Sequence, residues 1–461
     1  MAKHNEFEDF DQIYRRLREA EELPFSDLLK PERVARALAA LGVTFRERVY
    51  TPMATLWMFL SQVLSADHSC QDAVARLLAW RVARGKSPCS TETASYCEAR
   101  QRLPQQLVPQ LTRDVARDME QQADQRWLWK GRHVKIVDGS TATMADTSAN
   151  EAAYPRRRNQ VHGVGFPIMR VVAVFSMATA AVLDAALAPM RGKKTGETTL
   201  FGSLHTVLQP GDVLLVDRLF AGFRELAECR ARGVDVVARQ HQSRHTDFRR
   251  GRWLGTLDHV VTLQRPKFCS QRFEKSRWQR LPLELPVREL RFRVTQAGFR
   301  STEITLVTTL LDPVAYPAEE IAALYRERWN CELDLRSLKS SLQMSHLRCK
   351  TPEMVEKEVW THLLAYNLIR ETAAEAGRKH GTLPRRLSFQ GTVQLINAFA
   401  TYLPTCPERR KLLWEKLLAA VATIKVGNRP NRIEPRKLKK RKANYTYMMR
   451  PRTEERRRLC A

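Results

Sequence analysis

The sequence contains nine cysteines but no CxxC pair. Their scattered positions and odd number argue against a disulfide framework and a zinc finger, and they fit a reducing compartment. His241 and His245 lie four residues apart without further ligands nearby, so we expect no zinc site there. Long apolar runs are also missing. The most apolar stretch, 171–190, is interrupted by Asp184 and falls short of the roughly 18 uncharged residues that a spanning helix needs.

The first twelve residues are acidic and lack an apolar run, so they do not resemble a signal peptide. We therefore expect no membrane association and a cytoplasmic location. Acidic residues are fewer than basic ones: the 461 residues include 50 Asp and Glu but 77 Lys and Arg, which gives a net charge of +27. The 43% hydrophobic content is typical of a folded chain of several domains. Such a charge favours a polyanionic partner.

The excess positive charge is not spread evenly. Residues 1–128 hold 18 basic and 18 acidic side chains, whereas 240–302 hold 14 against 5 and the tail 425–461 holds 14 against 3. One such run alone would fit a solvated surface. Two separate runs on either side of a candidate active site favour nucleic acid, with the cations lying along phosphates.

The first 128 residues have the apolar spacing of helices, which we expect at 31–41, 52–66, 72–85 and 90–103. Helix, short break and helix is compatible with a helix-turn-helix that reads DNA ends, and equally with an ordinary helical bundle. Residues 351–424 are also expected to be helical and to cover the core or form dimer contacts, with 425–461 as a basic tail.

The period changes within 129–350, where short apolar strands alternate with helices. Strands are expected at 133–138, twice within 167–189, at 213–217, 234–239 and 304–310, and a long helix is expected at 317–342. Residues 240–302 are rich in β-strand and loop signals and fit an insertion. This order predicts an α/β fold with a mixed sheet flanked by helices.

Two acidic residues, Asp138 and Asp217, each follow an apolar strand. Acids at strand ends lie at the rim of an open α/β sheet, where ligands bind. Carboxylates of this kind suit Mg²⁺, so the pair indicates a shared metal site.

The expected helix 317–342 carries a polar stripe. At about 100° per residue, its members fall within about 60° of one another, while its leucines fall on a neighbouring face. The stripe consists of Tyr325, Arg328, Glu332 and Lys339. A solvated face with an Arg328–Glu332 ion pair explains the charges. It does not explain why this helix also provides an acid, Glu332, that is available beside the strand-end aspartates.

The spacing Y-x2-R-x3-E-x6-K of this stripe resembles the signature of bacterial insertion-sequence transposases of the IS-four type, members of the DDE superfamily. IVDGS around Asp138, LLVDRLF around Asp217, TGET at 195–198 and RIEPRKLKKRK at 432–442 fit the same family. The resemblance runs from about residue 50 to the tail. Leu219 departs from it, because a small residue commonly stands there.

The resemblance implies a ribonuclease-H-like mixed-sheet core with a β-rich insertion, flanked by helical N- and C-terminal regions. It implies that Asp138, Asp217 and Glu332 bind two Mg²⁺ ions, for which Mn²⁺ can substitute. Tyr325, Arg328 and Lys339 match residues that contact phosphates at the transposon end, and Trp329 matches one that helps to displace a base. Trp253 and Trp278 are candidates for a second stacking tryptophan.

The function implied is a transposase that cleaves the ends of an insertion sequence and joins their 3′-hydroxyls to target DNA, by cut-and-paste with a hairpin intermediate. A homodimer on double-stranded DNA, associated with the nucleoid, follows from the same resemblance. The alternatives are a catalytically silent, sequence-specific DNA-binding relative and a structure-specific nuclease on the same core. His133 and His162 are better explained as structural histidines than as members of the site.

Overall fold

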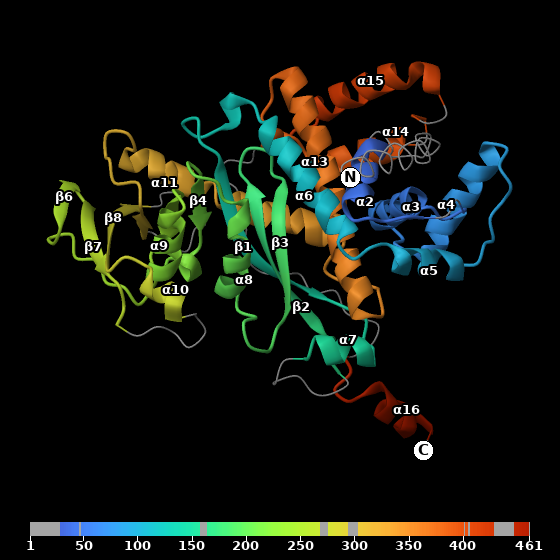
Figure 1. Cartoon of the computed structure of the whole chain (residues 1–461), viewed down its shortest axis with the longest axis horizontal. Coiled ribbons are helices and arrows are strands. Elements are labelled where there is room, and N and C mark those ends of the chain that lie inside the picture. The colour runs from blue at the N-terminus through green and yellow to red at the C-terminus, as the bar shows by residue number, and fades with distance from the viewer. Residues whose placement is uncertain are drawn as a thin grey trace, which may run out of the picture. The chain divides into compact units, whose positions relative to one another are not determined.

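The computed structural model describes residues 28–45, 48–156, 164–267, 275–293, 303–400, 402–403, 406–427 and 447–460. Contacts divide the chain into two compact units. The first, here the helical unit, comprises 1–128, 178–184 and 333–426; the second, here the sheet unit, comprises 129–177, 185–332 and 427–461. Figure 1 shows the elements of each. No helix in the described ranges has the length and apolar character to cross a membrane.

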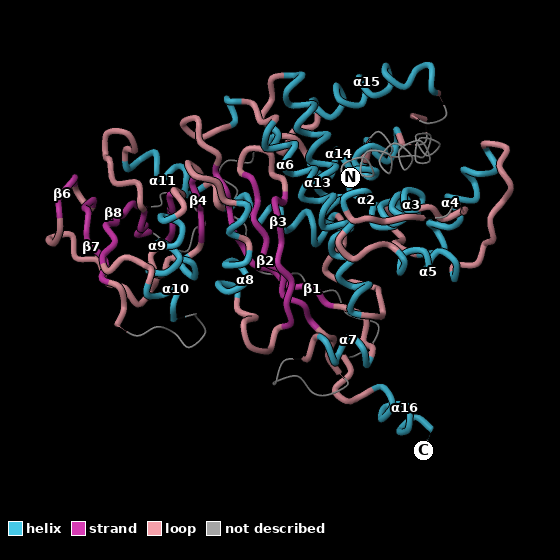
Figure 2. Tube along the Cα trace, in the orientation of Figure 1, coloured by secondary structure: helices cyan, strands magenta, loops and turns pink. Residues whose placement is uncertain are grey.

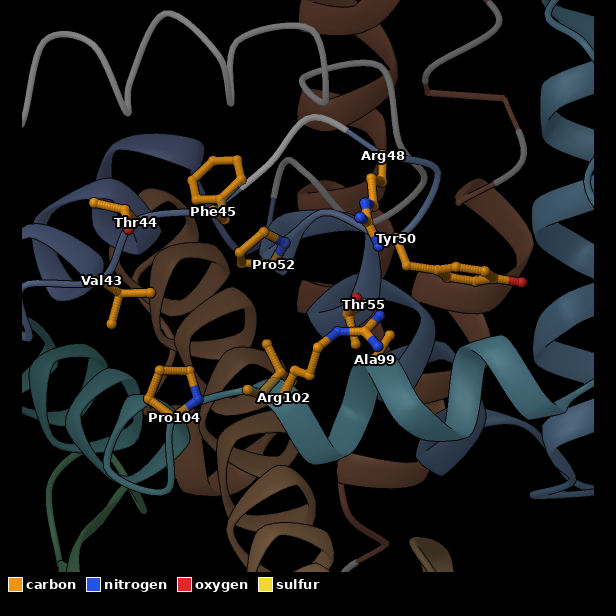
Figure 3. Close-up of a pocket in the computed structure, with 11 residues that line it drawn as sticks. Val43, Thr44, Phe45, Arg48, Tyr50, Pro52, Thr55, Ala99, Arg102 and Pro104 are labelled. Atoms are coloured by element: carbon orange, nitrogen blue, oxygen red, sulfur yellow. The ribbon is translucent and has the colours of Figure 1, made fainter.

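A nine-stranded mixed sheet is the framework of the sheet unit (Figure 2). Its strands, in spatial order, are β3 (Val182–Pro189), β2 (Ile168–Ser176), β1 (Val134–Thr143), β4 (Val213–Val216), β5 (Asp235–Arg239), β9 (Glu303–Thr308), β8 (Glu284–Arg293), β7 (Asp258–Gln264) and β6 (Arg252–Gly255). Strand β1 pairs antiparallel with β2 and parallel with β4, β4 pairs parallel with β5, and β5 pairs antiparallel with β9.

The central strands are apolar because both of their faces are covered. Ile136, Val137, Leu215 and Val237 have no exposed surface, and the four residues of β4 are all buried. Two helices of this unit precede and follow β4: α8 (Glu197–Ser203) and α9 (Phe223–Ala231). The α/β class and the mixed sheet predicted from the sequence are confirmed.

The insertion is β-rich over its described residues, 240–267 and 275–293, as predicted. Its strands do not form a separate sheet, because β8 pairs with β9 and β7 pairs with β8. The buried guanidinium of Arg288 holds this extension together by donating to Asp258 across β7 and β8, with Nε 2.7 Å from Oδ1. Helix α10 (Lys275–Gln279) precedes β8.

Helix α13 (Pro352–His380) is the centre of the helical unit. It contacts α3 (Pro52–Leu64), α6 (Leu107–Gln121), α14 (Phe389–Phe399) and α15 (Arg410–Thr423). It begins at Pro352, where the missing N–H costs nothing, and ends at Gly381, whose φ of +65° is easily adopted only by glycine. Helices α13, α14 and α15 give the described part of 351–424 the helical character expected from the sequence.

The remaining helices of this unit are α2 (Pro31–Ala40), α4 (Cys70–Ala83) and α5 (Ala94–Arg102). They match the predicted ranges within a few residues, but α5 begins after Thr93 rather than after Ser90. Helix α6 was not predicted.

The prediction of a single helix over 317–342 is wrong. It is divided into α11 (Ala318–Arg326), α12 (Trp329–Arg336) and a π-helical turn, Ser337–Ser341. Between α11 and α12 the backbone bonds span three residues: the N–H groups of Glu327 and Arg328 donate to the carbonyls of Leu324 and Tyr325 at 3.0 and 3.1 Å. This tighter winding, followed by a wider π turn, breaks the uniform 100° step on which the stripe was calculated.

Candidate catalytic site

Asp138 and Asp217 lie on adjacent parallel strands. Parallel pairing of β1 with β4 runs from Val134↔Val213 to Ile136↔Leu215, so each aspartate comes two residues after the last pair. Asp217 follows the end of β4, as predicted, and its side chain accepts the N–H of Arg218. The prediction that Asp138 ends its strand is wrong, because β1 continues to Thr143 in antiparallel pairing with β2.

Glu332 reaches the site from the first turn of α12. The guanidinium of Arg328 donates from Nη2 to Oε1 of Glu332 at 3.2 Å, and its Nη1 lies 3.6 Å from Oδ2 of Asp138. The side chain of Arg328 is only 17% exposed. One cation therefore bridges two of the three predicted acids.

The electrostatic interactions in the sheet unit show that Asp217, the third acid, also lies near Arg328. Burial raises the pKa of the Asp138 carboxyl; the Gly139 N–H and Arg328 oppose this shift, and the negative charges of Glu332 and Asp217 add to it. Burial acts to lower the pKa of Arg328, but Tyr325 and the three carboxylates outweigh it, so the pKa lies above its usual value. The three acids thus share one neighbourhood with one guanidinium.

The other two members of the predicted stripe, Tyr325 and Lys339, lie on α11 and on the π-helical turn, and Trp329 lies on α12. Tyr325, at the end of α11, is 7% exposed, and burial raises its pKa to about 12, so its hydroxyl stays protonated at neutral pH. Trp329, the first residue of α12, is 42% exposed. Lys339 belongs to the π turn in the helical unit, and its side chain is half-buried.

Sequence reasoning missed two charged residues of this region. Arg239 ends β5, the strand parallel and next to β4, and its charge acts on Tyr325. Its position at a strand end, like that of Asp217, is the signal that could have identified it. Glu197, in the TGET motif, lies against Gly139: a Cβ there would be 2.8 Å from the Glu197 carboxyl carbon. A side chain at position 139 would therefore require the Glu197 carboxylate to move.

The donor chemistry fits a hard divalent cation, which prefers carboxylate oxygens. Among the described residues, however, no three His, Cys, Asp or Glu side chains converge into a formed metal-binding group. The acids instead flank the Arg328 guanidinium, which offsets their charge. His241 has its Nδ1 2.6 Å from the Ser243 hydroxyl, and His162 lies outside the described residues.

Comparison with known proteins identifies the chain's family. The family model described as "Transposase DDE domain" matches residues 129–368, which is more than half of the chain. The chain belongs to the transposase DDE-domain family. Transposases of this family are enzymes that act on DNA and generally use divalent metal ions, so the predicted activity class is confirmed.

Similar curated proteins are also transposases. The chain is 29% identical over 432 residues to the transposase InsG for insertion sequence element IS4 of Escherichia coli strain K12, covering 91% of this chain and 92% of that one. It is 42% identical over 78 residues to the transposase for insertion sequence element IS421 of Escherichia coli, covering 17% and 21%. The predicted IS-four type is therefore confirmed.

One solved structure resembles the chain more distantly. It is a cryo-EM structure of a piggyBac transposase synaptic complex with hairpin DNA, with a TM-score of 0.44 and 9% identity. The match covers 90% of this chain and 85% of that chain.

Proposed function

We propose that this DDE transposase cleaves the ends of an insertion sequence and joins the freed 3′-hydroxyls to target DNA, by cut-and-paste with a hairpin intermediate. The observation that carries the proposal is the gathering of Asp138, Asp217 and Glu332 around Arg328 in one unit. Asp138 lies on strand β1, Glu332 lies on helix α12, and Asp217 directly follows β4, so regular elements position all three carboxylates.

We assign Asp138, Asp217 and Glu332 as the ligands of two Mg²⁺ ions, for which Mn²⁺ can substitute. Such a pair supplies a water activated for attack on a phosphodiester and stabilises the leaving oxygen. The backbone N–H of Gly139, 2.8 Å from Oδ1 of Asp138, orients that carboxylate for the task. No side chain needs to form a covalent bond to DNA in this chemistry.

The neighbouring polar side chains are assigned to the DNA. Arg328, Tyr325 and Lys339 are proposed to bind phosphates at the element end, since a guanidinium and an ammonium offset phosphate charge and a protonated phenol donates a hydrogen bond. Trp329 exposes part of its indole and is proposed to take the place of a displaced base, which fits a hairpin step.

The insertion offers two more tryptophans. Trp253 on β6 is 71% exposed, whereas Trp278 on α10 lies 6.4 Å from the Phe223 ring, centroid to centroid. We therefore favour Trp253 as a second stacking residue. Arg249, Arg250 and Arg252 stand near it in sequence, and the first two are highly exposed.

The other regions are assigned by charge and fold. We propose that residues 1–128 bind the element ends, that 129–350 form the catalytic core, that 351–424 contribute to a homodimer assembled on DNA, and that 425–461 lie along phosphates. The protein would then act on the nucleoid, in the cytoplasm. The motif 432–442 lies outside the described residues.

A joining assay separates this proposal from its rivals. The full chain is incubated with Mg²⁺, a supercoiled target plasmid and pre-cleaved duplexes that carry the element's inverted ends and a free 3′-hydroxyl. The proposal predicts end–plasmid products that disappear when the 3′ end is dideoxy-terminated. Cutting of branched DNA without joining would indicate a nuclease. Binding of the ends with neither reaction would indicate a silent DNA-binding relative.

A further inference from the structure

A second cluster of unusual chemistry lies in the helical unit, around Arg100 on α5. The arginine is 7% exposed, and among the residues that the structure describes no carboxylate lies within ion-pair distance of it, although its charge acts on the buried Glu358. Its Nη1 donates to the Gln62 side-chain oxygen at 3.3 Å. The guanidinium also lies against two aromatic rings, 5.0 Å from the Phe59 centroid and 4.9 Å from that of Tyr96.

Two thiols complete the surroundings of this cation. Nη2 of Arg100 lies 3.3 Å from Sγ of Cys70, the first residue of α4, and 3.5 Å from Sγ of Cys97 on α5. The two sulfurs are 3.9 Å apart. Both cysteines are free and only partly buried, so small solutes can reach them.

A buried guanidinium is costly unless an anion accompanies it. Here the groups in hydrogen-bond contact with Arg100 that can become anionic are thiols, and a nearby cation is the environment that makes a cysteine reactive. The pKa of Cys70 nevertheless lies above its usual value, because burial outweighs the opposing charge of Arg100. Stacking between Phe59 and Tyr96 keeps the guanidinium in place beside both sulfurs.

We propose that Cys70 and Cys97 form a peroxide-sensitive thiol pair that closes reversibly into a disulfide between α4 and α5. In the first step the Cys97 sulfur attacks hydrogen peroxide, forming an S–O bond to give a sulfenic acid and releasing water. In the second step the Cys70 sulfur attacks Cys97, the S–S bond forms, and a second water leaves. Two thiols lose two electrons in total, and the peroxide O–O bond accepts them.

The pair is independent of the transposase chemistry, because it lies in the helical unit and its oxidation consumes no DNA. Disulfides are rare in reducing compartments and are usually transient sensors there. A closed bond would tie the first turn of α4 to α5 and remove both sulfur contacts of Arg100. It would therefore alter the helical region that we assign to the element ends.

The test is peptide mapping of the oxidised full chain. The protein is treated with limiting hydrogen peroxide, its remaining thiols are blocked with N-ethylmaleimide, and it is digested without reductant. Trypsin leaves Cys89 and Cys97 together in peptide 87–100, so a second cleavage after Glu92 is needed to separate them. We expect a Cys70–Cys97 cross-link that dithiothreitol reverses.

Matched variants sharpen the result. Cys97→Ser should abolish the cross-link, whereas Cys89→Ser should retain it, because Cys89 is a partly exposed cysteine in the loop between α4 and α5. Recovery of Cys70 and Cys97 as separately alkylated thiols, while other cysteines oxidise, would overturn the proposal. A cross-link from either residue to Cys89 would do so as well. The wild-type map alone decides the matter if Cys97→Ser fails to fold.

Discussion

Arg328 pairs with two of the carboxylates that we assign to metal binding, so it competes with a cation for them. Arg328→Ala should therefore tighten Mn²⁺ binding to the DNA-free protein, by roughly two- to thirteenfold if the pair contributes about 0.5–1.5 kcal/mol. Isothermal titration calorimetry measures this directly. Arg328→Lys, which keeps the charge, is the control and should show little gain. Weaker Mn²⁺ binding in Arg328→Ala would show instead that the arginine organises the acids for metal.

His205 makes the stability of the sheet unit depend on pH. Burial, followed by the charges of Arg232, Arg277 and Arg224, lowers its pKa to about 4, against roughly 6.5 in an unfolded chain. Between about pH 4 and pH 6.5 the unfolded state binds more protons than the folded state. The free energy of unfolding therefore rises with pH across this window and decreases as the pH falls through it.

The expected contribution of His205 is at most about 1.4 kcal/mol per pH unit. Urea unfolding across this window should show a shallower pH slope in His205→Gln than in wild type. His380→Gln, at an exposed histidine near the end of α13, is the control and should leave the slope unchanged. Equal slopes in His205→Gln and wild type would contradict this role.

At the scale of elements, α12 carries two acids with different partners. Glu332 pairs with Arg328 in the sheet unit, whereas the fully buried Asp334 belongs to the helical unit. There it accepts from Arg370 at 3.0 Å and from Arg385 at 2.9 Å. One short helix therefore carries a partly exposed acid that we assign to the metal site and a buried acid that forms ion pairs within the helical unit.

Removing the buried acid should unfold the helical unit more easily. Asp334→Asn leaves Arg370 and Arg385 without their carboxylate and should lower the free energy of unfolding by about 3–5 kcal/mol. Glu98→Gln, which breaks an exposed 3.5 Å pair with Arg102, should change it by less than about 1 kcal/mol. Chemical denaturation of both variants measures the difference. Equal stabilities would contradict a structural role for the Asp334 pairs.

Comparison of the predicted and observed elements shows which parts of the fold are encoded in local sequence. Apolar spacing and capping residues identified most helices, and the end of the strand at Asp217 was predicted to within one residue. The continuation of β1 beyond Asp138 was not, because that extension depends on pairing with β2, which local residues do not encode. The break between α11 and α12 was missed because the residues there, Glu327 and Arg328, have ordinary helix propensity.

For the candidate site, the sequence indicated the residues but not their contacts. The acids were found because acids at strand ends and the helical stripe are visible in sequence. The Arg328–Asp138 contact depends on how α11 and α12 are wound, and the closeness of Glu197 to Gly139 depends on packing, so neither was foreseen. The Arg100–thiol cluster joins residues from α4 and α5 and had no sequence signal of its own.

For the whole molecule, the net charge of +27 should make DNA binding steeply dependent on salt. A chain ending at Gly427 loses 13 of the tail's 14 cations. We expect it to bind element ends more weakly and with a smaller slope of log affinity against log salt. Fluorescence anisotropy over a salt series measures both. An unchanged slope would show that the tail does not lie along phosphates.

We propose that Glu332 completes a metal-dependent catalytic site for DNA cleavage. The most direct test is excision from a plasmid that carries the element's inverted ends, with Mg²⁺, comparing wild type, Glu332→Gln and Glu327→Gln. Glu327 is an exposed acid next to α12, bonded to Asn330, and serves as the matched control. We predict double-strand breaks at both ends for wild type and Glu327→Gln, and end binding without cleavage for Glu332→Gln. Substantial cleavage by Glu332→Gln would contradict the assignment.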